Sequence, residues 1–355
     1  MTVRVNAAVT PGMSDEDAFK ARRAVMAQIE KESLDKTGFE SQVVTLYQGG
    51  QYRLYRYKKY TDVRLVFAPE EQTAFYGGDP DNFEYPRFDL DICIFRAYEN
   101  GQPAKVQNYL KWSAAGPSEN ELVFVSGNPG HTDRLRTVAE LEYLRDTAYP
   151  HILERLNRLE VLLGAYSARS QENARRARND LFGVRNSRKA RDGALAGLLT
   201  PSLFDQLRTA ERNLRAAVAT NSALSDTQGA WDRVDQAQQA IAKQSLEFNM
   251  LERGYGFSST LFGYGRELLR AAEERPKLDG DRLAEYRESA RASFEFRLFA
   301  EQPIYADLET LKLADSLTYL AESLGYNNPL VQKILGGQSP HERALEAVTG
   351  SKLAS

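Results

Sequence analysis

The amino-acid sequence predicts an α+β fold in which short strands come first and helices alone follow. Up to Thr132 the chain is rich in β-branched and aromatic residues arranged in short runs. After Thr132 the composition changes to alanine, leucine, arginine and glutamate, with apolar residues at helical spacing. Strands at short intervals followed only by helices are typical of an α+β protein or of two separate domains. We therefore predict one domain over residues 1–135 and a second, all-helical domain over residues 136–355.

Length and composition are those of an ordinary globular protein. The chain has 355 residues, 42% of them hydrophobic and 27% charged, which is enough for two domains with buried cores. The net charge of -3 argues against nucleic acid or an anionic membrane as the main partner, because such binding needs a clearly basic surface. Without an apolar run of about 18 residues we expect no transmembrane helix. With Cys93 as the single cysteine and three scattered histidines, we expect no disulfide, no metal site and no cofactor.

The strand-rich part begins with a helix and a hairpin. Residues 15–36 carry an apolar stripe at helical spacing, Ser14 stands at the N-cap position, and Gly38 follows the predicted end. Two β-rich runs then surround Gly49 and Gly50, which can supply the positive φ angles of a tight turn. Tyrosines alternate with basic residues in the second run, and we interpret this as a half-buried sheet face and not as a nucleic-acid surface. Further strands are predicted at 63–67, 73–75, 90–98 and 122–126.

The helical part contains several helices separated by proline, glycine and polar turns. Pro150 interrupts a leucine-rich helical pattern near its start. Residues 170–196 form another helical stretch, which we expect to bend or break at Gly183 and Gly193. Pro201 stands in the first turn of the next helix, where its missing N–H costs nothing. A loop is predicted at 221–229, and helices at 230–252, 266–275, 281–300, 305–324, 329–335 and 340–348.

The stretch over residues 75–98 carries the most distinctive chemistry of the chain. Its residues 77–82 permit positive φ, fix φ or bond their own backbone, so we expect an ordered turn system there. In the predicted strand that follows, Asp91 shares a face with Asp89, while leucine and isoleucine occupy the other face. Burying such an acid among apolar neighbours costs about 1–3 kcal/mol unless it is hydrogen-bonded. Asp91 therefore needs a partner.

Two motifs in the strand-rich part resemble a known enzyme family. The first is the order Gly-Gly-Asp-Pro-Asp-Asn, an aromatic residue, Pro-Arg and an acid four residues later, at residues 77–91. The second is Ser-Gly-Asn-Pro-Gly-His-Thr at residues 126–132. Both are similar to motifs of the bacterial periplasmic dipeptidyl-peptidases called seven and eleven, which are serine exopeptidases. The resemblance implies that residues 1–135 are the C-terminal part of a chymotrypsin-like barrel, and residues 136–355 a truncated helical cap inserted between two barrels.

The resemblance also implies roles for four residues. Asp91 matches the aspartate of a Ser-His-Asp triad, which holds the histidine in one tautomer while that histidine deprotonates the serine. Asn82 and Phe83 match the residues that hold the free N-terminus of the substrate, and family members often have tryptophan in place of Phe83. Asn186, within the Val-Arg-Asn-Ser-Arg-Lys run, matches a helical asparagine that contacts the same amine from above.

Three of these residues also have a structural interpretation. Asp91 could pair with a backbone amide or with Arg87, and Asp89 on the same face competes for the catalytic role. Asn82 could close an Asx-turn on its own backbone, which is compatible with amine binding. Asn186 could simply be one polar residue on a solvated helix face.

Two motifs of the family are missing from the sequence. Neither a His-His-Cys-Gly string, for the catalytic histidine, nor a Gly-Asn-Ser-Gly-Ser type string, for the nucleophile, occurs. His131, His151 and His341 are not accompanied by the acid and nucleophile that catalysis needs. The glycine-rich run at 126–134 lacks the lysine of a phosphate-binding loop, so we interpret it as a strand-to-helix turn. We expect a middle segment of a longer enzyme, without its signal peptide and inactive by itself.

On this resemblance the chain is a segment of a periplasmic serine dipeptidyl-peptidase that releases dipeptides from the N-termini of peptides. The expected partner is a peptide with a free N-terminus, and the helical domain would block longer N-terminal extensions. The full-length protein would be a homodimer, with dimer contacts partly outside this segment. The alternative is a catalytically inactive peptide-binding or scaffolding protein built from the same parts.

Overall fold

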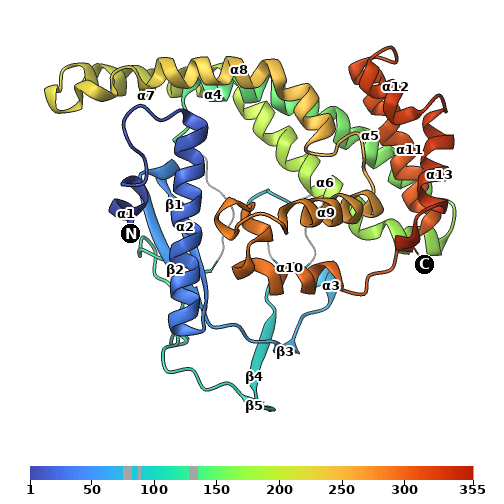
Figure 1. Cartoon of the computed structure of the whole chain (residues 1–355), viewed down its shortest axis with the longest axis horizontal. Helices are drawn as coiled ribbons and strands as arrows, with labels where there is room; N and C mark the ends of the chain where they lie inside the picture. The colour runs from blue at the N-terminus through green and yellow to red at the C-terminus, as the bar shows by residue number, and fades with distance from the viewer. Residues whose placement is uncertain (75–81, 87–88, 128–134, 355) are drawn as a thin grey trace.

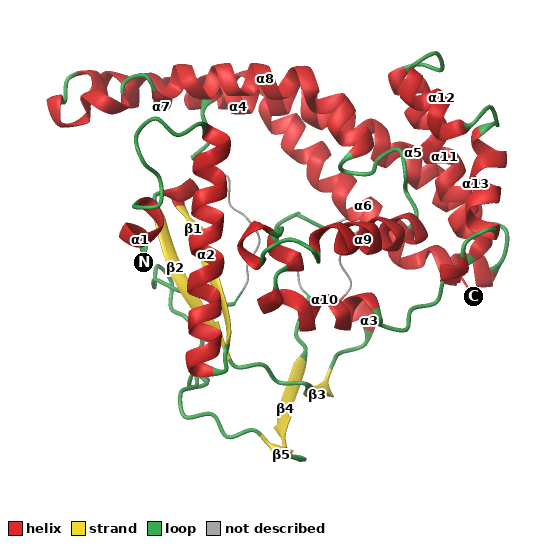
Figure 2. Ribbon diagram, in the orientation of Figure 1, coloured by secondary structure: helices red, strands yellow, loops and turns green. Residues whose placement is uncertain are grey.

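The chain combines a strand-bearing part with a larger helical part, as Figure 1 shows. The computed structural model describes residues 1–74, 82–86, 89–127 and 135–354. All described strands precede Val138, and every described element from Val138 onward is helical, so the predicted order of strands followed by helices alone is confirmed. Figure 2 shows the strands at the left and the bottom of the view, with most of the helices across the top and the right. The described strands form two separate antiparallel sheets and do not close into a barrel.

The chain begins with two helices, and the second has the caps that its sequence predicts. The Ser14 hydroxyl accepts a hydrogen bond from the backbone N–H of Asp17 at 3.1 Å, as an N-cap does. At the other end Gly38 is left-handed, with a φ of 69°, and its N–H donates to the carbonyl of Leu34. The helix predicted over 15–36 is therefore confirmed. The two helices are α1 (Thr2–Asn6) and α2 (Asp15–Thr37).

A β-hairpin follows α2 and packs against it. Strand pairing ends at Leu46 and Gln51, so the turn contains four residues. It is therefore longer than the two-residue glycine turn that the sequence predicts. Positive φ angles fall at Tyr47 and Gly49 (51° and 100°), whereas Gly50 is right-handed helical. The hairpin is confirmed, but its turn type is not the predicted one. The strands are β1 (Glu40–Leu46) and β2 (Gln51–Tyr57), joined by the 3-10 turn η1 (Tyr47–Gly49).

The second sheet is shorter than the sequence predicts. The strand predicted over 90–98 begins only at Ile94, because its pairing with the preceding strand starts where Phe67 faces Ile94. The strand predicted at 73–75 is wrong, since its described residues end a short helix. The strand predicted at 122–126 is also wrong, because these residues are irregular. The elements are β3 (Asp62–Phe67), α3 (Glu71–Ala74), β4 (Ile94–Glu99) and β5 (Gln102–Pro103).

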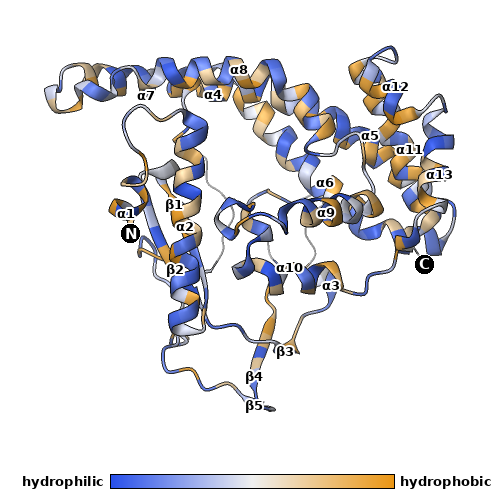
Figure 3. Cartoon of the chain, in the orientation of Figure 1, coloured by the Kyte–Doolittle hydropathy of each residue, from blue (hydrophilic) through white to orange (hydrophobic). Residues whose placement is uncertain are grey.

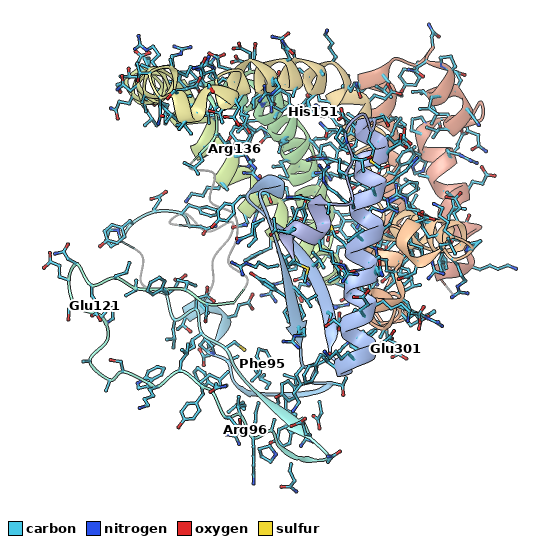
Figure 4. The ribbon with its side chains drawn as sticks, turned by 60° about the vertical axis from the view of Figure 1, so that its left-hand side comes forward. Phe95, Arg96, Glu121, Arg136, His151 and Glu301 are labelled. Carbon is cyan, nitrogen blue, oxygen red and sulfur yellow. The ribbon has the colours of Figure 1, made fainter. Side chains whose placement is uncertain are left out.

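The second sheet and the loop after it leave large apolar side chains exposed. Leu65 and Phe95 on the sheet are 62% and 59% exposed, and Trp112 and Phe124 in the loop are 88% and 87% exposed. Figure 3 shows that β3 and β4 extend away from the helices, and Figure 4 shows Phe95 and the loop through Glu121 standing apart from them. Apolar patches of this extent are rare on the surface of a monomeric globular protein.

The helical part is built on two long helices that lie side by side. Pro150 occupies the first turn of one of them, immediately after a single π-helical turn, so the interruption predicted there is a change of helix type and not a break. The predicted break at Gly183 and Gly193 is wrong, because the other helix runs through both positions. A helical glycine costs about 1 kcal/mol relative to alanine, which packing along a neighbouring helix can offset. The elements are α4 (Val138–Tyr143), η2 (Leu144–Ala148), α5 (Tyr149–Ser167) and α6 (Gln171–Leu199).

The remaining helices extend this scaffold on two sides. In Figure 1, α7 and α8 form a long arm, while α11 to α13 pack together near the C-terminus, with α11 beside α5. The predicted helix over 281–300 is wrong in its first half, which consists of short 3-10 turns. The predicted loop at 221–229 contains a 3-10 segment. The elements are α7 (Pro201–Ala219), η3 (Ser222–Thr227), α8 (Ala230–Leu251), α9 (Thr260–Glu274), η4 (Asp279–Asp281), η5 (Ala284–Tyr286), η6 (Glu288–Ala290), α10 (Arg291–Leu298), α11 (Ala306–Leu324), α12 (Pro329–Leu335), α13 (Pro340–Thr349) and η7 (Lys352–Ala354).

A buried ion pair joins the N-terminal elements to the 3-10 region. Arg287 donates to Glu30 through Nη1 and Oε2 at 2.9 Å, and the two residues are 3% and 5% exposed. The other oxygen of Glu30 accepts the backbone N–H of Val43 on β1 at 2.8 Å. One carboxylate thus links α2, β1 and the segment between η5 and η6. Removal of one partner from such a buried pair leaves a charge in a low-dielectric site and costs about 3–5 kcal/mol.

We expect the substitution Arg287→Met to lower the free energy of unfolding by about 3 kcal/mol or more, because it leaves the Glu30 carboxylate buried without its cation. Adding Glu30→Gln should recover much of that loss, since the amide oxygen can still accept from Val43. Urea unfolding followed by circular dichroism measures both. The exposed pair of Arg4 and Glu32, joined at 2.7 Å, gives the control, and Arg4→Met should leave stability almost unchanged. Equal effects of the two arginine substitutions would contradict this account.

Candidate functional site

The structure brings together the two asparagines that the resemblance assigns to the substrate amine. Asn82 opens the turn at residues 82–86, whereas residues 77–81 of the predicted turn system lie outside the described residues. Asn186 lies in the second half of α6, 104 positions after Asn82 in the chain. The Nδ2 of Asn82 donates to the Oδ1 of Asn186 at 2.9 Å. Asn82 is only 5% exposed, so its side chain is held in a mostly dry position at the surface of α6.

A second contact fixes the same turn to the same helix. Glu84 and Lys189 form an ion pair at 3.1 Å. Residues three apart on a helix lie on one face, so Asn186 and Lys189 present a single face of α6 to the turn. The described residues 82–86 are therefore attached to the helical part at both Asn82 and Glu84.

Phe83 lies between these two attachment points and is turned outward. Its φ is 64°, in the left-handed region that aromatic residues rarely occupy. Its side chain is 61% exposed. The backbone thus directs Asn82 toward α6 and leaves the Phe83 ring open to a ligand or to another part of the protein.

The opposite side of α6 near Asn186 is fixed to α5 by charge. Arg185 and Arg188 donate to the two oxygens of Glu160 at 3.1 Å and 2.6 Å. Burial raises the pKa of Glu160, but the bonds from the two arginines outweigh it and bring this pKa below its usual value. The carboxylate stays ionised and sets the rotation of α6, which determines where Asn186 points.

Asp91 does not occupy the buried strand position that its sequence context predicts. It lies three residues before β4 and is exposed to solvent. The backbone around it is ordered by a bond from Leu90 N–H to the carbonyl of Thr73 at 2.9 Å. No donor among the described residues contacts the Asp91 carboxylate, and its alternative partner Arg87 lies outside those residues. The burial predicted for Asp91 is wrong, and its catalytic role stays a prediction.

Of the three histidines, His151 is a packing residue of the helical part. Its Nδ1 lies 3.2 Å from the hydroxyl of Tyr319, and the two rings are stacked with centroids 6.0 Å apart. Burial lowers the pKa of His151, which favours the neutral imidazole. His341 is exposed in the first turn of α13, and His131 lies outside the described residues. The strand-to-helix turn predicted at 126–134 also falls mostly outside them.

A charged cluster between α6, α9 and α11 was missed by sequence reasoning. The Lys312 ammonium contacts Asp180 at 2.9 Å and Glu309 at 3.0 Å. Glu309 also accepts from the Ser259 hydroxyl at 2.7 Å and from the backbone N–H of Thr260 at 2.6 Å, at the N-terminus of α9. Burial lowers the pKa of Lys312, but the two carboxylates outweigh it and raise it above its usual value. The only signal in the sequence was the spacing of Glu309 and Lys312, three residues apart on one helix.

The described part of the chain contains neither a metal-binding cluster nor a membrane-spanning helix. No group of three or more His, Cys, Asp and Glu side chains in it could hold a metal ion. None of its helices is both long and apolar enough to cross a membrane.

Known proteins share both the sequence pattern and the fold. An Asp/Glu-specific dipeptidyl-peptidase of Shewanella putrefaciens is 31% identical over 304 residues, which is 80% of this chain and 40% of that protein. A dipeptidyl-peptidase 7 of Capnocytophaga gingivalis is 27% identical over 60% of this chain and 31% of that protein. The crystal structure of Porphyromonas endodontalis DPP11 in complex with the dipeptide Arg-Glu matches 94% of this chain and 49% of its own, with a TM-score of 0.64 and 20% identity. The chain thus spans less than half the length of these relatives.

The family match covers the full sequence. The peptidase S46 family matches residues 1–355, which include Asn82, its partner Asn186 on α6 and the exposed Asp91 before β4. The chain belongs to the peptidase S46 family.

Proposed function

We propose that this chain is part of a serine dipeptidyl-peptidase that removes dipeptides from the free N-terminus of peptides. The contact between Asn82 and Asn186 carries the proposal. Two amides from distant parts of the chain meet at the place where the family resemblance puts the substrate amine. The membership of the family and the names of its dipeptidyl-peptidase relatives support the same reaction.

The chemistry of the two amides suits an ammonium group. A side-chain carbonyl oxygen has two lone pairs, and the Oδ1 of Asn186 uses one of them to accept from the Nδ2 of Asn82. The other can accept from the –NH₃⁺ of a substrate, and hydrogen bonds to charged groups are worth about 1.5–3 kcal/mol. An exopeptidase needs such a contact because the position of the amine decides which peptide bond reaches the nucleophile. The exposed Phe83 ring can cover the apolar part of the first residue.

Asp91 is the residue that we propose for the triad. In this proposal β3 to β5 belong to a chymotrypsin-like barrel, and the exposed Leu65 and Phe95 are covered by further strands of that barrel. The exposed Asp91 carboxylate then orients a histidine from another part of the enzyme and stabilises the positive charge that forms on its imidazole. The histidine and the serine come from regions of the relatives that this chain does not span. A periplasmic location and a homodimer, both implied by the resemblance, complete the proposal.

A second candidate is a peptide-binding protein without catalysis. One observation favours it: neither the His-His-Cys-Gly string nor the Gly-Asn-Ser-Gly-Ser type string occurs in the 355 residues. It needs the same amine contact but no role for Asp91. The two candidates therefore agree on binding and differ in the effect of Asp91 on hydrolysis.

The amine site is tested by the substitution Asn186→Ala. We expect a short peptide with a free N-terminus to bind the variant about tenfold more weakly or worse, because one charge-assisted hydrogen bond is lost. Isothermal titration of the chain with the free and the N-acetylated peptide measures this. The exposed Asn157 on α5 supplies the control, and Asn157→Ala should leave binding unchanged. If the acetylated peptide binds as tightly as the free one, the proposed amine site is wrong.

The triad role is tested by Asp91→Asn in a polypeptide that joins this chain to the histidine and serine segments of an S46 relative. Hydrolysis of dipeptidyl chromogenic substrates should fall by about four orders of magnitude, because the amide favours the wrong histidine tautomer. Asp89→Asn should keep most of the activity. Equal rates for Asp91→Asn and the parent would exclude Asp91 from the mechanism and favour the non-catalytic candidate.

A further inference from the structure

A cleft of about 540 Å³ lies between α5, α6 and the start of α9. Its floor is apolar and consists of Leu156, Leu159 and Leu163 from α5 and Val184 from α6. Its walls carry polar groups from several elements, among them Arg155 of α5 and Lys312 of α11. Asn186 is not among the residues that line it. The cleft is therefore a separate place from the proposed amine site, although both use α6.

Arg155 is the cation of this cleft that has no counter-ion in the described part of the chain. Its neighbour one turn along α5, Arg158, binds Asp315 at 2.8 Å and Glu322 at 2.7 Å. The Arg155 guanidinium instead stacks over the ring of Tyr255, 4.3 Å from the centroid. Burial lowers the pKa of Arg155, which reflects the cost of holding this charge partly out of water. A guanidinium that is stacked on one face keeps its in-plane N–H donors for an oxygen ligand.

The other charges around the cleft restrict the kind of anion that fits. Lys312 is already paired with Asp180 and Glu309, so it does not attract a further anion strongly. Asp180 itself lines the cleft and repels negative charge. A dianion such as phosphate meets one cation and one nearby carboxylate, whereas a single carboxylate can bind Arg155 in a bidentate way and place its remaining atoms elsewhere.

Gly183 keeps the α6 wall of the cleft open. It lies within α6, where glycine is unfavourable relative to alanine. A Cβ atom added at Gly183 would meet nothing within 4 Å. The position thus has room for a larger side chain, and that side chain would take up space in the cleft that Gly183 lines.

We propose that this cleft binds a small monocarboxylate with an apolar body, such as an apolar amino acid or the C-terminus of a short peptide. The carboxylate lies on Arg155, and the apolar body lies on the leucines of α5. The hydroxyl and amide groups of the walls accept or donate the remaining hydrogen bonds of the ligand. This site binds a carboxylate such as the C-terminus of a peptide, whereas the Asn82 and Asn186 pair binds the N-terminal amine.

The test is isothermal titration of the 355-residue chain with N-acetyl-leucine and with its uncharged amide, N-acetyl-leucinamide. Acetylation removes the amine that Asn82 and Asn186 require, so the result is independent of the proposed peptidase site. We expect saturable binding of N-acetyl-leucine, and at least about tenfold weaker binding of the amide, because the charged hydrogen bonds to Arg155 are lost. Arg155→Gln should weaken binding of the acid by a similar factor and leave binding of the amide unchanged.

Two substitutions of Gly183 fill the cleft to different extents and remove no polar group. Gly183→Leu should abolish binding, and Gly183→Ala should keep it, while both favour the helical conformation of α6. Far-ultraviolet circular dichroism confirms that each variant is folded. The proposal fails if N-acetyl-leucine shows no saturable binding, if Arg155→Gln or Gly183→Leu binds it as the parent does, or if inorganic phosphate binds as tightly.

Discussion

The attachment of residues 82–86 to α6 is the interaction on which the functional interpretation depends. The amide contact between Asn82 and Asn186 and the ion pair between Glu84 and Lys189 connect the strand-bearing part to the middle of a long helix. A buried amide that lost its partner would pay a desolvation cost of about 1–3 kcal/mol. The turn is therefore held at one place along α6, and a site made of groups from both parts becomes possible.

The rotation of α6 is itself fixed by charges and packing. Glu160 on α5 binds Arg185 and Arg188 on one side of Asn186, and Asp180 binds Lys312 of α11 closer to the helix start. Between these ion pairs, Leu181 and Val184 of α6 pack against a buried cluster that includes Leu163 of α5 and Ala177. Because the contacts come from two neighbouring helices, α6 can tolerate Gly183 and Gly193 without a kink. The residues that fix α6 are thus distinct from the residue that it presents.

Local signals in the sequence predicted the helices well, and long-range pairing decided what they missed. The N-cap Ser14, the terminal Gly38 and the prolines at the helix starts act within a few residues, so their effect can be predicted without knowledge of the fold. A strand needs a partner, and the apolar run before Ile94 has none in the described chain, so it is irregular. The pairing of Glu30 with Arg287 spans 257 positions, and an acid on a helix gives no sign that it is buried.

The candidate site shows the same division between local pattern and long-range contact. Spacing around Asp91 suggested a buried strand acid, and the structure shows an exposed residue before the strand. The meeting of Asn82 and Asn186 could not be inferred from spacing at all, and only the family resemblance placed both at one ligand. Polar residues whose partner is a substrate leave no internal pattern, because selection acts on their position relative to a molecule outside the chain.

Arg155 poses the same problem. In the structure the neighbouring Arg158 binds Asp315, whereas Arg155 lies over the Tyr255 ring and has no carboxylate partner among the described residues. The sequence alone does not show which of the two arginines is paired. The pairing of charges in the fold therefore singles out Arg155 as a candidate for ligand binding, which sequence spacing alone does not do.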